Sequence, residues 1–169
     1  MKKNITTPES VTEHGMLAFA DCISLKNIII SESVIKILGR AFEERTRLER
    51  IIIPEGVTEI GEKTFSGCTS LTNITIPEGV TYIGKYAFAE CKSLTNIIIP
   101  ESVTEIGKCA FIFCTSLTNI TIPESVIEIG ESAFAFCKSL KKISLPKKVG
   151  LGYSVFFRCH PDLKIEYRD

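Results

Sequence analysis

The sequence has no tryptophan, only two histidines and no excess of either charge, because twenty acidic residues balance twenty basic ones. Balanced charge argues against nucleic acid or an anionic membrane as the main partner. No apolar run approaches the ~18–20 residues that a membrane-spanning helix needs. The start, MKKNITTPES, has two lysines but no apolar stretch, so it does not read as a signal peptide. We therefore expect neither nucleic-acid binding nor membrane insertion.

Catalytic and metal-binding motifs are absent as well. His14 and His160 lie near opposite ends of the chain, and no C-x-x-C, P-loop, G-x-S-x-G or H-E-x-x-H motif occurs. Cys159 and His160 are neighbours in sequence, but a catalytic pair requires that thiolate and imidazole meet in space. The sequence therefore predicts no enzyme activity, no catalytic residue, no metal site and no cofactor.

In place of motifs the chain has one regular period. Three residue types recur every 23 residues over most of its length. A period of this size indicates a solenoid, in which stacked copies turn each inward position into a continuous column. The columns are Leu25, Leu48, Leu71, Leu94, Leu117 and Leu140; Ile28, Ile51, Ile74, Ile97, Ile120 and Ile143; and Phe19, Phe42, Phe65, Phe88, Phe111 and Phe134.

The copy LTNITIPEGVTYIGKYAFAECKS, residues 71–93, predicts the structure of one unit. Polar and apolar residues alternate before Pro77, which indicates a short strand that ends where the proline removes a backbone donor. Such strands are expected at 73–76, 96–99 and 119–122. Gly84 is expected to supply a positive φ at the next corner. Ala87, Phe88 and Cys91 are expected to point inward from one compact 3₁₀ or α turn.

The pattern L-x-x-I-x-I-P-x-x-V-x-x-I-G-x-x-A-F-x-x-C resembles the BspA-like leucine-rich repeat over nearly the whole chain. The resemblance implies a leucine-rich-repeat solenoid, right-handed and of the β-rich α/β horseshoe type, with short parallel strands, 3₁₀ turns and little regular helix. We expect one domain, 1–169, of about seven 23-residue units, of which the first, second and last are irregular.

The resemblance also implies a function. Such repeats point to a non-enzymatic protein-binding or adhesion module of an extracellular or cell-surface protein, with a protein ligand bound through the strand face and its rim. The alternative is a structural spacer or stalk in a larger repeat protein, because the third to sixth copies are nearly identical and offer little chemical variety.

Outward positions on the strands provide the candidate binding surface. The amides at one of these positions can form a side-chain ladder, which we favour over a binding role. The outward isoleucines can either stabilise strands or form an apolar patch for a partner. The candidate residues are Asn27, Ile29, Arg50, Ile52, Asn73, Thr75, Asn96, Ile98, Asn119, Thr121 and Lys142.

The cysteines occupy a repeat position and do not suggest a disulfide framework. We expect a column of buried, reduced thiols that includes Cys22, Cys68, Cys91, Cys114 and Cys137. Arg45 takes the cysteine position of the second copy, within a charged run, 43–47, that reads as a solvated turn or a local recognition bump. Cys109 is equivalent to Lys63 and Tyr86, so it is expected to face outward and to label fastest.

The two ends of the chain differ. The first copy has Lys2 and His14 where Leu and Ile are expected, so its end is partly polar and shows no cap. We expect residues 1–12 to fray, and the chain to be a monomer or a weak end-to-end dimer. The last copy loses one residue between Val149 and Gly152, and its charged tail LKIEYRD is expected to act as a cap.

Overall fold

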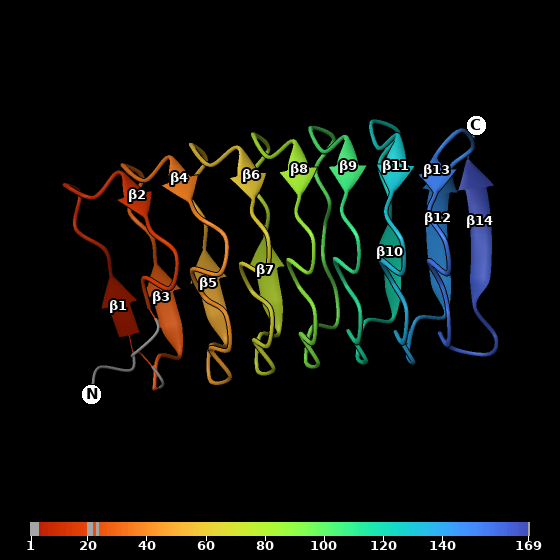
Figure 1. Cartoon of the computed structure of the whole chain (residues 1–169), viewed down its shortest axis with the longest axis horizontal. Helices are drawn as coiled ribbons and strands as arrows, with labels where there is room; N and C mark the ends of the chain where they lie inside the picture. Colours follow the sequence, from red (N-terminus) through yellow and green to blue (C-terminus); the bar gives the residue numbers. More distant parts are fainter. Residues whose placement is uncertain (1–3, 20–21, 23, 169) are drawn as a thin grey trace.

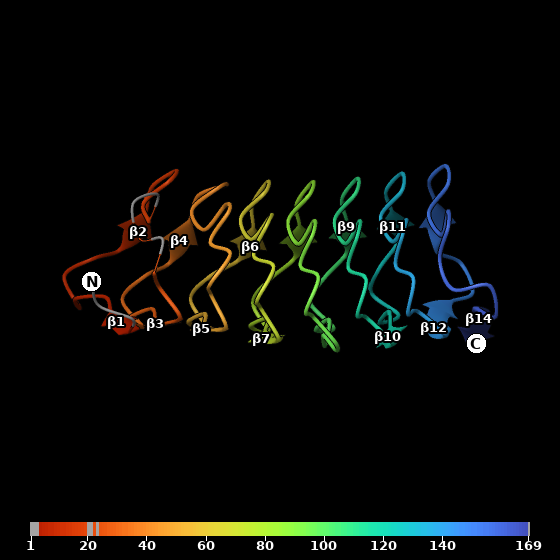
Figure 2. The ribbon, with the colours of Figure 1, turned by 90° about the horizontal axis from the view of Figure 1, so that it is seen from below.

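The computed structural model describes residues 4–19, 22 and 24–168. Each 23-residue copy forms one turn of a β-solenoid, and the strands lie in two rows that run in opposite directions (Figure 1). Seen from below, the two rows occupy different sides of the stack (Figure 2). The stack has little curvature in either view, so the expected horseshoe shape is not confirmed. No helix occurs in the described residues.

The first row carries the alternating segments that the sequence predicts. Its strands pair in parallel as two sheets, β1-β3-β5-β7 and β10-β12-β14. The register places equivalent residues of successive copies opposite one another, as in Ile28, Ile51 and Ile74. The strands are β1 (Asn4–Thr6), β3 (Asn27–Ile29), β5 (Arg50–Ile52), β7 (Asn73–Thr75), β10 (Asn119–Thr121), β12 (Lys142–Pro146) and β14 (Lys164–Arg168).

The second row is made of two-residue strands that follow the proline turn. They also pair in parallel, as β2-β4 and β6-β8-β9-β11-β13. The strands are β2 (Glu13–His14), β4 (Lys36–Ile37), β6 (Glu59–Ile60), β8 (Tyr82–Ile83), β9 (Glu105–Ile106), β11 (Glu128–Ile129) and β13 (Gly150–Leu151).

One predicted strand does not form. The segment 96–99 makes only an isolated bridge, from Ile98 to Thr75, and this gap separates the two sheets of the first row. Ile97 and Ile99 remain buried. The break therefore affects strand hydrogen bonding and leaves the core packing intact.

The interior of the solenoid consists of the predicted columns. All six leucines of the repeat and all six phenylalanines are buried, which confirms the inward assignment. Consecutive phenylalanine rings from Phe19 to Phe134 are stacked, with centroids 4.7 to 5.4 Å apart. A single copy could not bury these side chains, so the hydrophobic stabilisation of each copy depends on its neighbours.

The compact turn differs in detail from its prediction. Ala87, Phe88 and Cys91 do point inward, but the turn contains no regular 3₁₀ or α helix. Its left-handed residues are Tyr86 and Glu90, with φ of 56° and 58°, and not Gly84. Their N–H groups donate to carbonyls of the next copy, at 2.9 Å from Tyr86 and 2.8 Å from Glu90. These bonds offset the cost of a left-handed residue that carries a Cβ, about 1–2 kcal/mol.

Gly84 is required for space and not for its φ. A Cβ at this position would lie 2.6 Å from the carbonyl carbon of Gly61 in the preceding copy. The same close approach recurs at Gly107, Gly130 and Gly152. This glycine column therefore allows the backbones of successive copies to touch.

The N-terminal end of the chain is more apolar than its sequence indicates. His14 is buried beside Phe19, with ring centroids 5.1 Å apart, so it does not make the end polar. Its Nε2 has no hydrogen-bond partner among the described residues, and burial lowers the pKa of the imidazole. β1 pairs in register with β3; Lys2, where the first copy departs from the repeat, lies outside the described residues. The charged tail, expected to act as a cap, forms a further strand, β14, which pairs along β12 and leaves Tyr167 exposed.

Candidate protein-binding face

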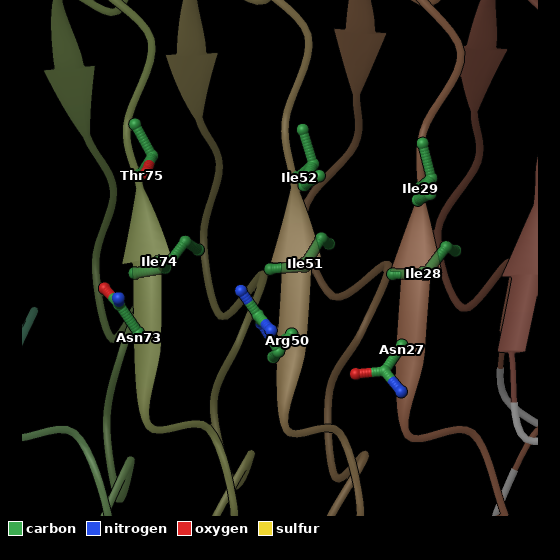
Figure 3. A pocket seen from close by; sticks show the side chains of 9 residues that line it. All are labelled: Asn27, Ile28, Ile29, Arg50, Ile51, Ile52, Asn73, Ile74 and Thr75. Carbon is green, nitrogen blue, oxygen red and sulfur yellow. The ribbon is translucent and has the colours of Figure 1, made fainter.

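The first sheet presents two rows of outward side chains, which we call the isoleucine face. Asn27, Arg50 and Asn73 form a polar row, and Ile29, Ile52 and Thr75 form a second row beside it (Figure 3). Alternation along β3, β5 and β7 sends Ile28, Ile51 and Ile74 inward between the two rows. These nine residues line an open hollow of about 500 Å³.

The isoleucines of this face are exposed, as the alternation predicts. Ile29 is 50% exposed and Ile52 is 56% exposed, while Ile98, in the segment that forms no strand, reaches 73%. One step of the expected amide ladder forms, where Asn27 Nδ2 donates to Asn4 Oδ1 at 2.8 Å, whereas Asn119 Nδ2 donates to Thr118 Oγ1 at 3.1 Å. Arg50 takes the amide position of the copy that follows Asn27, so the ladder is interrupted there.

The eleven candidate residues do not form one continuous site. Six of them make up the isoleucine face. Asn96, Ile98, Asn119 and Thr121 line a second hollow of about 280 Å³, on the other side of the sheet break. Lys142 lines neither hollow, and its ammonium group pairs with Glu166 at 2.9 Å. The structure therefore places ten of the eleven candidates in two groups and leaves Lys142 outside both.

The cysteine column is buried from Cys68 to Cys137, as predicted, but Cys22 at its start is only partly buried. The four buried thiols each donate a hydrogen bond to the carbonyl of a phenylalanine in the preceding copy, for example from Cys91 to Phe65 at 3.3 Å. Burial raises the pKa of Cys68 and Cys114 to about 12. Arg45 fills the same position, and its Nη1 donates to the Phe19 carbonyl at 3.2 Å. Arg45 is therefore not only part of a solvent-exposed charged run. Its guanidinium group makes the hydrogen bond to a phenylalanine carbonyl that a thiol makes in other copies.

The prediction for Cys109 is wrong. Its side chain is buried, with 5% exposure, although it has a left-handed φ of 55° like the lysine and tyrosine at the equivalent positions. The neighbouring Tyr86 side chain, which hydrogen-bonds to Cys109, explains the burial. A short thiol is covered by its neighbour, whereas the longer Lys63 and Tyr86 side chains reach solvent.

Thiol labelling with a maleimide should therefore begin at the ends of the column. Cys22 and Cys159 are only partly buried, whereas the other five cysteines are buried. Burial also raises the pKa of Cys159, which reduces the reactive thiolate. We expect Cys22 to react first, Cys159 next, and the buried five only after denaturation, as followed by peptide mass spectrometry. Labelling of Cys109 at the rate of Cys22 would contradict this assignment.

A second aromatic column was not predicted from the sequence. Phe113 and Phe136 stack with centroids 4.5 Å apart, and Phe157 meets Phe136 edge-on at 5.5 Å. Arg158 lies over both Phe136 and Phe157. The sequence indicates this column only through the 23-residue spacing of Phe113 and Phe136, because the other copies have no phenylalanine at this position.

A separate hollow of about 540 Å³ lies near the C-terminal end, lined by Glu124, Ile127, Pro146 and Arg168 among others. Within the described residues, no group of three or more His, Cys, Asp and Glu side chains is placed to hold a metal ion. His160 accepts a hydrogen bond from the Asp162 amide at 3.0 Å, which indicates a local turn contact. The same part of the chain contains no helix with the length and apolar character needed to cross a membrane.

Comparison with known proteins agrees with this architecture. A leucine rich repeat protein of T. pallidum is 33% identical, with a TM-score of 0.89 over 95% of this chain and 79% of that chain. The pneumococcal vaccine antigen PcpA is 25% identical, with a TM-score of 0.55 over 99% of this chain and 40% of the antigen. A leucine rich cell surface protein from Faecalibacterium prausnitzii is 22% identical, with a TM-score of 0.53 over 99% and 70%.

No curated protein matches the chain. The family described as "BspA type Leucine rich repeat region (6 copies)" matches residues 2–70 and 36–164. These matches extend over most of the chain and coincide with the repeat that builds the solenoid. The chain therefore belongs to the BspA type leucine-rich repeat family.

Proposed function

We propose that the chain is a non-enzymatic protein-binding module and that its partner contacts the isoleucine face. The observation that carries this proposal is the exposure of Ile29 and Ile52 beside Arg50 in an open hollow. Thr75 and Thr121 occupy the equivalent position in other copies. Threonine supports a strand as a β-branched residue without adding apolar surface. Strand formation therefore does not require the exposed isoleucines, which leaves contact with a partner as their role.

We further propose that the module acts at the cell surface or outside the cell. Its similarity to the pneumococcal vaccine antigen supports this location, although the chain spans only 40% of the antigen. The free cysteines are compatible with an oxidising environment. Five of the seven are buried, and buried thiols with a raised pKa react slowly.

The change Ile52→Lys tests the proposal, because it places a charge in the apolar row without altering the core. We expect binding to a partner captured from a panel of extracellular-matrix and cell-surface proteins to weaken about tenfold or more, as a central apolar contact is lost. Biolayer interferometry gives the Kd of each variant. Circular dichroism spectra should match those of the unmodified chain.

Ile127→Lys provides the matched control. Ile127 is 71% exposed but lies next to β11 in the second row of strands, away from the isoleucine face. We expect this variant to bind as the unmodified chain does. Equal losses in both variants would contradict a site on the isoleucine face. A panel in which no protein binds would favour the alternative, a structural spacer in a larger repeat protein.

A further inference from the structure

The isoleucine face contains one charge, and its surroundings indicate the kind of partner it selects. We propose that Arg50 binds a carboxylate of an acidic peptide segment, whose neighbouring apolar side chain rests on Ile29 and Ile52. This inference rests on the proposed function, because it concerns the same face. It adds the chemistry of the partner: an aspartate or glutamate next to a large apolar residue.

The positive charge of Arg50 is not compensated within the described part of the chain. Its neighbours in register are the uncharged Asn27 and Asn73. The adjacent acid, Glu49, is engaged by the ammonium group of Lys26 at 2.5 Å. No ion pair of Arg50 is present among the described residues, and its side chain is exposed. A partner carboxylate would therefore meet an available guanidinium group.

The geometry of the face suits a carboxylate next to an apolar group. Arg50 and Ile52 are alternate residues of β5, so they project from the same side, about 7 Å apart along the strand. The planar guanidinium binds a carboxylate through two parallel hydrogen bonds. Asn27 and Asn73 lie on either side in the polar row (Figure 3). The Asn27 amide already donates to Asn4, which leaves the Asn73 amide to donate to the same carboxylate.

The second hollow lacks this chemistry, which confines the inference to the isoleucine face. Asn96 and Asn119 replace the arginine there, and Glu101 adds a negative charge to the lining. Lys142 has the equivalent repeat position in a later copy, but it already pairs with Glu166. Arg50 is thus the cation of the polar row that is available to an acidic ligand. A single arginine beside apolar surface also fits a peptide better than nucleic acid, which requires an extended basic patch.

Selection from a random peptide library displayed on phage tests the inference. The full chain is immobilised, and the selected peptides are counter-screened against the Ile52→Lys variant, so that only binders of the isoleucine face are kept. We expect these peptides to be enriched in Asp or Glu within two positions of Leu, Ile, Phe or Trp. The best of them is then synthesised together with a version in which the acid is replaced by its amide.

Fluorescence anisotropy then measures the coupling between Arg50 and the acid. We expect Arg50→Gln to weaken binding of the acidic peptide about tenfold, since a charge-assisted bidentate pair is lost. Replacing the acid by its amide should weaken binding to the unmodified chain by a similar factor. With Arg50→Gln, the amide peptide should bind almost as well as the acidic peptide does. The control Lys36→Gln, which removes a charge from β4 in the second row, should leave the affinity unchanged.

The outcomes separate this inference from the proposed function. Peptides that depend on Ile52 but bind equally well to Arg50→Gln would overturn the acidic selectivity and leave the binding face in place. A library without any peptide that depends on Ile52 would count against the face itself, and therefore against both. Equal losses in Arg50→Gln and Lys36→Gln would indicate general electrostatic attraction and would also overturn the specific pair.

Discussion

Gly130→Ala is expected to lower the free energy of unfolding by about 3 kcal/mol or more, because it overpacks backbone against backbone. The new Cβ would lie 2.5 Å from the Lys108 amide nitrogen and 2.7 Å from the Gly107 carbonyl carbon. Neither atom can rotate away as a side chain would. Gly130 N–H donates to the Ile106 carbonyl at 2.7 Å, so separating the two copies also weakens a backbone hydrogen bond. Urea denaturation followed by circular dichroism measures the change.

Gly15→Ala is the matched control for this prediction. No atom of the described part of the chain lies within 4 Å of a Cβ built on Gly15, so the same methyl group meets no described neighbour. We expect a change within about 0.5 kcal/mol, as for other exposed sites without special features. A Gly130→Ala variant as stable as Gly15→Ala would show that successive copies can separate at little cost, which contradicts the close-packed glycine column.

The repeat predicts the core well because period and burial have the same cause. Stacked copies place every Leu71 equivalent above the next, so one copy suffices to assign the inward column in all of them. The same reasoning predicts that Asn27, Arg50 and Ile52 face outward, and the structure confirms it. The family follows from these residues too, since the inward columns are the motif itself.

Departures from the prediction occur where contacts between copies determine the outcome. The residue type predicts a positive φ at Gly84, but glycine is needed there because a Cβ would lie 2.6 Å from the Gly61 backbone. The equivalent residues Lys63 and Tyr86 predict an outward Cys109, yet its side chain is buried and hydrogen-bonds to the neighbouring Tyr86 side chain. A repeating pattern of residue types predicts the direction of a side chain, but it does not predict which neighbouring groups cover that side chain.

For the candidate site, too, side-chain direction can be predicted from the sequence, whereas contacts between copies cannot. Each of its residues could be assigned to the outward side of a strand from the alternation alone. The sheet break at 96–99, which divides the candidates into two hollows, occurs in a copy whose sequence is close to ideal, and nothing in the structure explains it. The isolation of Arg50 also required the structure, because it depends on the pairing of Glu49 with Lys26 across copies.

Phe88→Ala is expected to lower the free energy of unfolding by about 3–5 kcal/mol, the range for removing a fully buried phenylalanine. The ring has no exposed surface and lies between Phe65 and Phe111, with centroids 5.4 and 5.2 Å away. Its loss leaves a cavity that both neighbouring copies line. Because each copy is stabilised mainly by its neighbours, the damage should extend beyond the altered copy.

Phe113→Ala separates the buried column from aromatic stacking in general. Phe113 also stacks on a phenylalanine of the next copy, at 4.5 Å, but it is 37% exposed. We expect its removal to lower the free energy of unfolding by about 1 kcal/mol, the contribution of a partly exposed aromatic pair. Urea denaturation of both variants, with hydrogen exchange of the copies on either side, provides the comparison. Similar losses in the two variants would mean that ring stacking, and not burial of the inner column, holds the copies together.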